Sequence, residues 1–95
     1  MSERDEYVNK LKARLDQWDA EIKKLRARAE EASADARIDQ QKRLAEMRAQ
    51  RDKAEQKLKE VRQAGDEAWD DLKSGFDRAI GSMSKAFEDA MARFK

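Results

Sequence analysis

The fold of this protein is decided by residues 11–36, which read LKARLDQWDAEIKKLRARAEEASADA. Apolar side chains recur in this stretch at alternating steps of four and three residues, a spacing that predicts the seam of a coiled-coil helix. The seam residues are Leu11, Leu15, Trp18, Ile22, Leu25, Ala29, Ala32 and Ala36. Most of the residues between them are charged or Gln, so the helix carries one narrow apolar stripe. Such a stripe requires a partner helix, either within the chain or in a second copy of it.

The composition favours elongated helices over a large globular core. The chain has 95 residues, of which 45% are charged and 6% are aromatic. Pro is absent and the 3 Gly residues all follow residue 64, so nothing in the first 64 residues breaks a helix. We therefore expect an all-α fold with a single coiled-coil domain over residues 1–95.

Charge and residue usage narrow the classes of function. The 22 basic and 21 acidic side chains leave a net charge of +1, which creates no field to attract nucleic acid. Residues 1–64 hold 17 basic and 14 acidic side chains and residues 65–95 hold 5 and 7, so net charges of +3 and −2 favour docking between the two segments. The chain has no Cys, a charged beginning and no long apolar run, from which we expect a cytoplasmic protein.

The apolar stripe continues past residue 36 and favours one helix over residues 2–63. After one stutter, its further members are Gln40, Leu44, Met47, Arg51, Ala54, Leu58 and Val61. We interpret the polar members, Gln40 and Arg51, as lying at the flank of the interface with their head groups in solvent. In seam positions they would instead weaken the packing and fix the register. An alternative is a turn near Ser33, because Ser33 or Asp35 is a suitable cap for a new helix.

A second helix is predicted over residues 67–94. Gly65 suits the left-handed residue that ends a helix, and Asp66 suits the cap of the next one. The apolar face of this helix consists of Trp69, Leu72, Phe76, Ile80, Met83, Phe87, Met91 and Phe94. Beside that face runs a row of small residues, Ala68, Gly75, Ala79, Ala86 and Ala90, which allows another helix to approach closely. Gly81 falls on the polar side, where the pattern gives no reason for it.

These elements predict an elongated antiparallel helical hairpin. The second helix is long enough to cover residues 36–63, which leaves the seam from Leu11 to Ala32 for another chain. A homodimer is the simplest way to cover that seam, and an unidentified protein partner is the other source of a covering helix. If the chain turns near Ser33, three helices of about 30 residues form a three-helix bundle instead.

The residues that usually carry chemistry are sparse or dispersed. With no His and no Cys, we expect no enzyme and no catalytic, cofactor-binding or metal-binding residue. Adjacent acids such as Asp70 and Asp71 diverge on a helix and are interpreted as solvated surface. Ser82 and Lys85 match the Ser-x-x-Lys spacing of serine acyl-enzymes, but the accompanying motifs are absent. The basic span 42–62 is interpreted as an ion-paired face, for example with Glu55 next to Lys59.

The second helix also has the character of a lipid-binding helix. Its apolar face holds one Trp, three Phe and two Met at an eleven-residue period, which is typical of amphipathic helices at membrane surfaces. The helix is net negative, however, and lacks the Lys and Arg that attract anionic lipid. We therefore keep a membrane surface as an alternative partner and favour helix packing.

Three segments carry a resemblance to a known group of proteins. They are residues 7–12 (YVNKLK) followed by Leu15, Trp18 and Ile22, residues 34–38 (ADARI) and residues 68–75 (AWDDLKSG). Together they resemble small bacterial coiled-coil proteins of the cyanobacterial type that is labelled stress-response. The resemblance implies a self-associating scaffold or adaptor and transfers no catalytic or ligand-binding residue.

Overall fold

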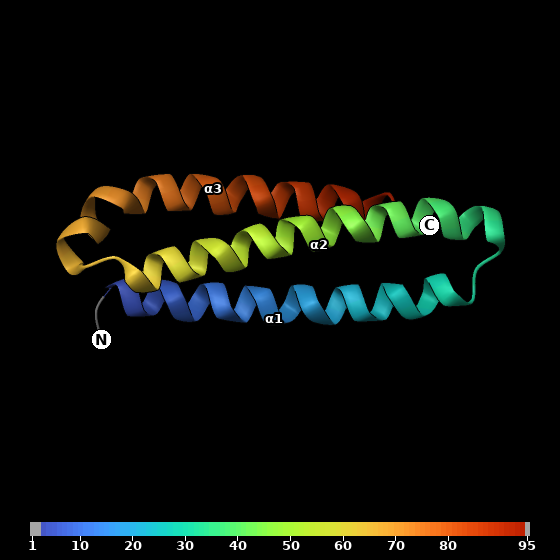
Figure 1. The fold of residues 1–95 in the computed structure, drawn as a ribbon, viewed down its shortest axis with the longest axis horizontal. Coiled ribbons are helices and arrows are strands. Elements are labelled where there is room, and N and C mark those ends of the chain that lie inside the picture. Colours follow the sequence, from blue (N-terminus) through green and yellow to red (C-terminus); the bar gives the residue numbers. More distant parts are fainter. Residues whose placement is uncertain (1–2, 95) are drawn as a thin grey trace.

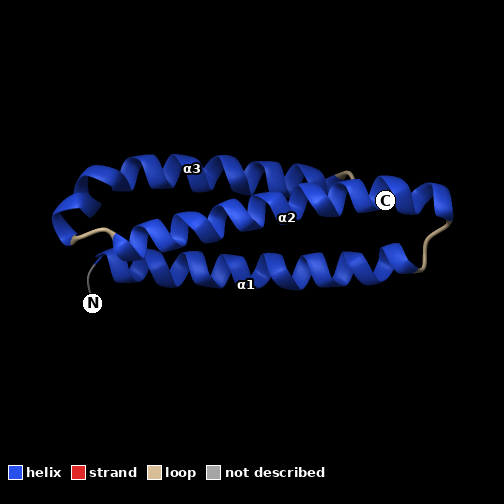
Figure 2. Cartoon of the chain, in the orientation of Figure 1, coloured by secondary structure: helices blue, strands red, loops and turns tan. Residues whose placement is uncertain are grey.

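A computed structural model describes residues 3–94, apart from the side chain of Asp66. Within that range the chain forms three α-helices, α1 (Glu3–Glu30), α2 (Ala34–Gln63) and α3 (Asp66–Ala92). The helices run up, down and up as an antiparallel bundle joined by two short loops (Figures 1 and 2). The bundle measures 52 × 19 × 17 Å. The all-α prediction is confirmed, and of the two architectures considered the structure is the three-helix bundle.

The expectation of one helix over residues 2–63 is wrong, because the chain turns at residues 31–33. Ser33 is the N-cap of α2, and its Oγ accepts a hydrogen bond from the backbone N–H of Ala36 at 3.4 Å. Arg37 donates to the carbonyl oxygens of Ala29, Glu30 and Ala32 at 3.2, 2.9 and 3.3 Å. These contacts satisfy groups that both helix ends leave unpaired, so the turn is stabilised on both sides. The start expected at Ser2 lies outside the described residues.

The boundary between α2 and α3 is where the sequence predicted it, but its geometry differs. Gly65 has φ −73° and ψ 164°, so it is extended and not left-handed. It is also the N-cap of α3, the position expected for Asp66, which instead begins the helix. The backbone N–H of Ala64 bonds to the carbonyls of Glu60 and Val61, which closes α2 without a left-handed residue.

The seam of α1 is covered by the chain's own helices. Leu11, Leu15, Trp18, Ile22, Leu25 and Ala29 are all buried, and Ala32 is half-buried. The indole of Trp18 stacks on the ring of Phe87 from α3 with centroids 4.5 Å apart. Our inference that the seam needs a second chain depended on an unbroken first helix, so it no longer holds.

The apolar face of α3 points mostly into the same core. Trp69, Phe76, Ile80, Met83 and Phe87 are buried, and Met91 and Phe94 are half-buried. Leu72 departs from the expected face, with 45% of its surface exposed. The row of small residues is also only partly buried. Ala90 is buried and Ala79 and Ala86 are half-buried, while Ala68 and Gly75 are exposed.

The two polar stripe residues of α2 behave differently from each other. Gln40 is 6% exposed, and its Oε1 finds no hydrogen-bond partner among the described residues, so its predicted solvent exposure is wrong. Arg51 keeps 24% of its side chain exposed and extends its guanidinium toward α1, which agrees with a position at the flank.

Candidate interaction surfaces

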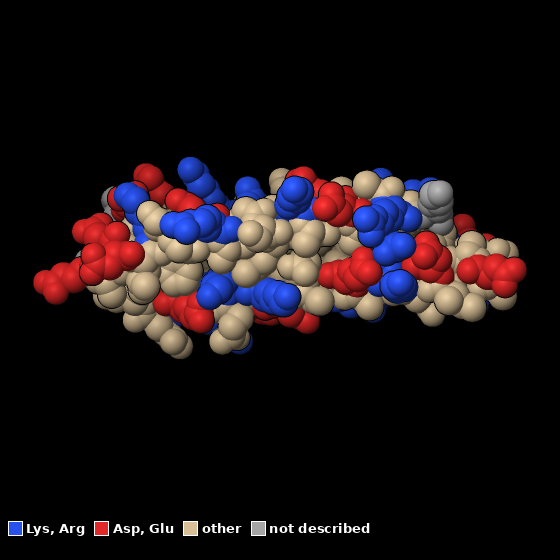
Figure 3. Space-filling model, turned by 90° about the horizontal axis from the view of Figure 1, so that it is seen from above, with Lys and Arg blue, Asp and Glu red and all other residues tan. Residues whose placement is uncertain are grey.

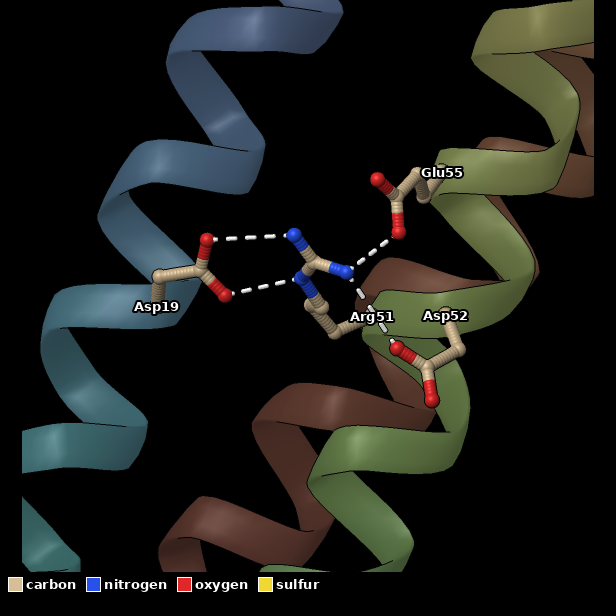
Figure 4. A network of polar contacts seen from close by, with 4 residues as sticks. All are labelled: Asp19, Arg51, Asp52 and Glu55. Atoms are coloured by element: carbon tan, nitrogen blue, oxygen red, sulfur yellow. Dashed lines mark hydrogen bonds and ion pairs between the residues drawn. The ribbon is translucent and has the colours of Figure 1, made fainter.

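The strongest polar contact between helices is a cluster around Arg51 (Figure 4). Its Nε and Nη2 donate to the two carboxylate oxygens of Asp19 on α1, at 2.8 and 3.3 Å. Its Nη1 donates to Glu55 and, at 3.3 Å, to Asp52, both on α2. The hydrogen bond to Asp19 above all raises the pKa of Arg51 further above its ordinary value. This two-pronged geometry fixes α1 against α2, and with every donor group engaged its role is structural.

Polar contacts also join α1 to α3. Lys73 Nζ lies 2.7 Å from Glu3 Oε1, and this hydrogen bond raises the pKa of Lys73. Arg14 Nη1 donates to Ser84 Oγ at 3.0 Å. These contacts lie on the surface, where solvent screens single ion pairs and their contribution to stability is small. They set the alignment of α3 and form no chemical site.

An aromatic group lies where α1 meets the start of α3, with Trp69 and Phe76 buried and Tyr7 half-buried. The rings of Tyr7 and Trp69 have centroids 4.9 Å apart, and Trp69 lies 6.1 Å from Phe76. Neither Tyr7 Oη nor Trp69 Nε1 has a hydrogen-bond partner in the part of the chain that the structure describes. Burial first, and the negative charge of Asp77 next, raise the pKa of Tyr7 to about 12.

Two depressions lie at the junction of α1 and α3, and Gly81 lines one of them. A depression of about 250 Å³ is lined by Tyr7, Leu11, Arg14, Ile80 and Gly81, and a neighbouring one of about 290 Å³ includes Trp69 and Lys73. A Cβ added at Gly81 meets nothing within 4 Å. Gly81 therefore lies in the wall of this depression, which the sequence pattern did not predict.

A third depression, of about 450 Å³, lies between the end of α1 and the first half of α2 and is larger than the other two. We call it the arginine groove, and its lining includes Arg26, Arg37, Arg48, Ala29 and Leu44. Glu30 is the acid in its lining. Sequence reasoning missed this groove, because it exists only where the chain turns at residues 31–33.

Two large apolar side chains are exposed among residues 3–94, and they lie at opposite ends of the bundle. Ile38, near the turn between α1 and α2, is 73% exposed, and Leu72, near the start of α3, is 45% exposed. Figure 3 shows acidic side chains gathered over the end at which α2 passes into α3. Acidic side chains also lie at the opposite tip in that view, so each end offers an apolar contact among charged side chains.

The residues weighed for chemistry form no assembled site. Within residues 3–94 no three or more carboxylates gather in a way that could hold a metal ion. Asp70, Asp71, Ser82 and Lys85 are exposed on the helix surface. In the basic span of α2, Arg43 pairs with Asp39 and Glu46 at 3.5 and 3.3 Å, which agrees with an ion-paired face. Glu55, however, pairs with Arg51 and not with Lys59.

Comparisons with known proteins identify no relative of this chain. Family models, curated proteins and solved structures give no match to this chain. None of the helices formed by residues 3–94 combines the length and the hydropathy that crossing a bilayer requires.

Proposed function

We propose that the chain is a non-enzymatic interaction protein that self-associates, with the dimer as the first step, and that serves as a scaffold or adaptor. The observation that carries the proposal is the placement of Ile38 and Leu72, which are exposed at opposite ends of a bundle 52 Å long. Covering an exposed apolar side chain is favourable, so a side chain of this kind at each end of the bundle supports contacts that join molecules. A stress-related setting is supported by the sequence resemblance alone.

The surface for self-association differs from the one that the sequence indicated. The seam from Leu11 to Ala29 is buried within the chain, so contacts between copies must use the exterior. Most of that exterior is charged, with both signs mixed along each helix. The exposed apolar side chains are therefore the contacts that support association.

The experiment is sedimentation equilibrium over a hundredfold range of concentration, with circular dichroism on the same samples. We expect a highly helical protein whose average mass rises with concentration. Replacing both exposed apolar side chains, Ile38→Ser with Leu72→Ser, is expected to weaken that rise while the helix signal stays unchanged. Ala45→Ser, at another exposed position of α2, is the matched control. A mass equal to one chain at every concentration would exclude self-association.

A second candidate function is lipid-surface binding through α3. The observation that favours it is the pair of unpartnered donors, Tyr7 Oη and Trp69 Nε1, within the described α1–α3 contact, because that contact must open to release the aromatic face of α3. Because Trp69 is already buried in the folded chain, its emission is no measure of insertion, and co-flotation with neutral lipid vesicles is the test. The chain is expected to float with the vesicles if α3 inserts, and a chain that stays in the dense fraction at a large excess of lipid would exclude this function.

A further inference from the structure

We propose that copies of this chain pair end to end, with the start of α3 of one copy docked in the arginine groove of the next. The inference rests on the proposed self-association and specifies its two surfaces. The surfaces differ from each other and lie at opposite ends of the bundle, so one molecule cannot pair them with itself. We assign a second copy of the chain as the occupant of the groove, because the charges of the two surfaces are complementary.

The arginine groove presents positive charge over an apolar floor. Ala29 and Leu44 form the floor, at 3% and 2% exposure. Arg37 is held by the carbonyl oxygens at the end of α1, as described above. Arg26 and Arg48 are exposed and make no hydrogen bond or ion pair with another described residue. Two guanidinium groups are thus available to carboxylates from outside.

The start of α3 presents the complementary surface, which we call the acidic strip and define as Glu67, Ala68, Asp71, Leu72 and Gly75. At 100° per residue these positions fall on one continuous side of the helix, with Leu72 at one edge and Glu67 at the other. All five are exposed. Neither carboxylate has an ion-pair partner within residues 3–94, and a Cβ at Gly75 meets open space. The strip is thus uncovered, apolar along one edge and negative along the other.

The two surfaces match in chemistry. Leu72 fits the apolar floor between Ala29 and Leu44, and the carboxylates of Glu67 and Asp71 match the two unpaired guanidinium groups. The small side chains at positions 68 and 75 let the backbone of α3 approach the groove closely. Ile38, about 60° round α2 from the groove residue Gln41, extends the apolar contact at the rim.

This pairing is heterologous, because each contact joins two different surfaces. Each added copy therefore leaves one free groove and one free strip, so association continues beyond the dimer unless the copies close into a ring. The contact is small and partly ionic, which places it among weak, salt-sensitive interactions. We expect the average mass to rise with concentration and to fall with added salt.

Charge reversal at either surface tests the pairing. The groove variant carries Arg26→Glu with Arg48→Glu, and the strip variant carries Glu67→Lys with Asp71→Lys. Each is expected to lower the association constant by at least about tenfold, because like charges then face each other. Lys12→Glu with Lys53→Glu makes the same change of net charge as the groove variant at exposed positions outside both surfaces, and is expected to associate like the natural chain.

A mixture of the two variants is the decisive measurement. Each variant retains one intact surface, so an equimolar mixture at low salt is expected to contain dimers of one groove variant and one strip variant. The reversed groove and the reversed strip left free on such a dimer carry opposite charges, so the mixture is expected to recover growth beyond the dimer. Circular dichroism confirms that every variant stays folded.

The outcomes separate this inference from the proposed function. If the natural chain associates and the two variants associate equally well, the surfaces are wrong and self-association stands. If the variants are monomeric alone and in the mixture, the end-to-end arrangement is wrong. If the natural chain itself remains monomeric at all concentrations, both proposals fail.

Discussion

At the residue scale, a few buried side-chain polar atoms of the described residues have no hydrogen-bond partner. Gln40 lies in the core beside apolar neighbours, and its Oε1 has no hydrogen-bond donor among the described residues. An unpaired buried polar group costs about 1–3 kcal/mol, because it loses its hydrogen bonds to water. The buried Oε1 of Gln40 therefore lowers the free energy of unfolding of the protein.

Replacing Gln40 with Leu is expected to raise the free energy of unfolding by about 1–3 kcal/mol, because the unpaired amide is removed and apolar surface is buried. Urea unfolding followed by circular dichroism measures the change. The neighbouring Gln41 is exposed, so Gln41→Leu is the matched control and is expected to have little effect. A loss of stability in Gln40→Leu would show that the amide makes a required contact.

Tyr7 offers a direct readout of the contact between α1 and α3, because it is the single Tyr of the chain. Ultraviolet titration of the folded protein is expected to give a pKa of about 12, against the ordinary value of 10.0 in denaturant. The raised pKa means that the folded state keeps the proton more tightly. Its contribution to stability is complete below pH 10 and is lost as the pH rises toward 12. Asp77→Asn is expected to lower the folded pKa, and a folded value near 10 would contradict the buried position of the ring.

At the element scale, each helix is defined by its ends as much as by its apolar stripe. Ser33 and Arg37 stabilise the break between α1 and α2, whereas Gly65 begins α3 without a side-chain cap. The interior of α3 also contains Gly81, which raises the entropy cost of forming that helix. These features leave α3 open to stabilisation by a single substitution.

Gly81→Ala is expected to stabilise the protein by about 1 kcal/mol, because Ala favours the helix and a Cβ at this position has open space. Chemical denaturation of the variant beside the natural chain measures the effect. Ser74→Ala, at another exposed position of α3, corrects for the general gain from Ala and is expected to give about half of that increase. Lower stability in Gly81→Ala would show that the depression between α1 and α3 must stay open.

At the scale of the whole molecule, the turn at residues 31–33 sets the shape. A continuous helix over residues 2–63 would extend about 90 Å at 1.5 Å per residue. The bundle instead has a longest dimension of 52 Å and a radius of gyration of 15.5 Å over its Cα atoms. The same turn creates the arginine groove, so shape and interaction surface depend on one feature.

Small-angle X-ray scattering tests that shape. At low concentration and high salt we expect a radius of gyration close to 15.5 Å and a maximum dimension little above 52 Å. At low salt and rising concentration the maximum dimension is expected to increase, as end-to-end pairing requires. A maximum dimension near 90 Å at the lowest concentration, where association is absent, would indicate an unbroken first helix.

The sequence by itself determined that the chain is helical on both sides of residues 31–33 and which side of each helix is apolar. The periodicity that marks Leu11, Trp18, Phe76 and Phe87 as core positions is a local property, since it follows from 3.6 residues per turn. The boundary near Gly65 follows equally from local preference. These predictions concern short stretches of chain, so the structure confirms them.

Only the tertiary structure decided which helix covers which face. Around Ser33 the local preferences for a continuous helix and for a turn are nearly balanced, because Ala favours the helix while Ser and Asp favour a cap. Folding back lets one chain bury the seam from Leu11 to Ala29, and burial of each large apolar side chain contributes about 1.5–3 kcal/mol. That gain depends on residues far apart in the sequence. It therefore decides the turn, the burial of Gln40, the exposure of Leu72 and the arginine groove, none of which a local pattern encodes.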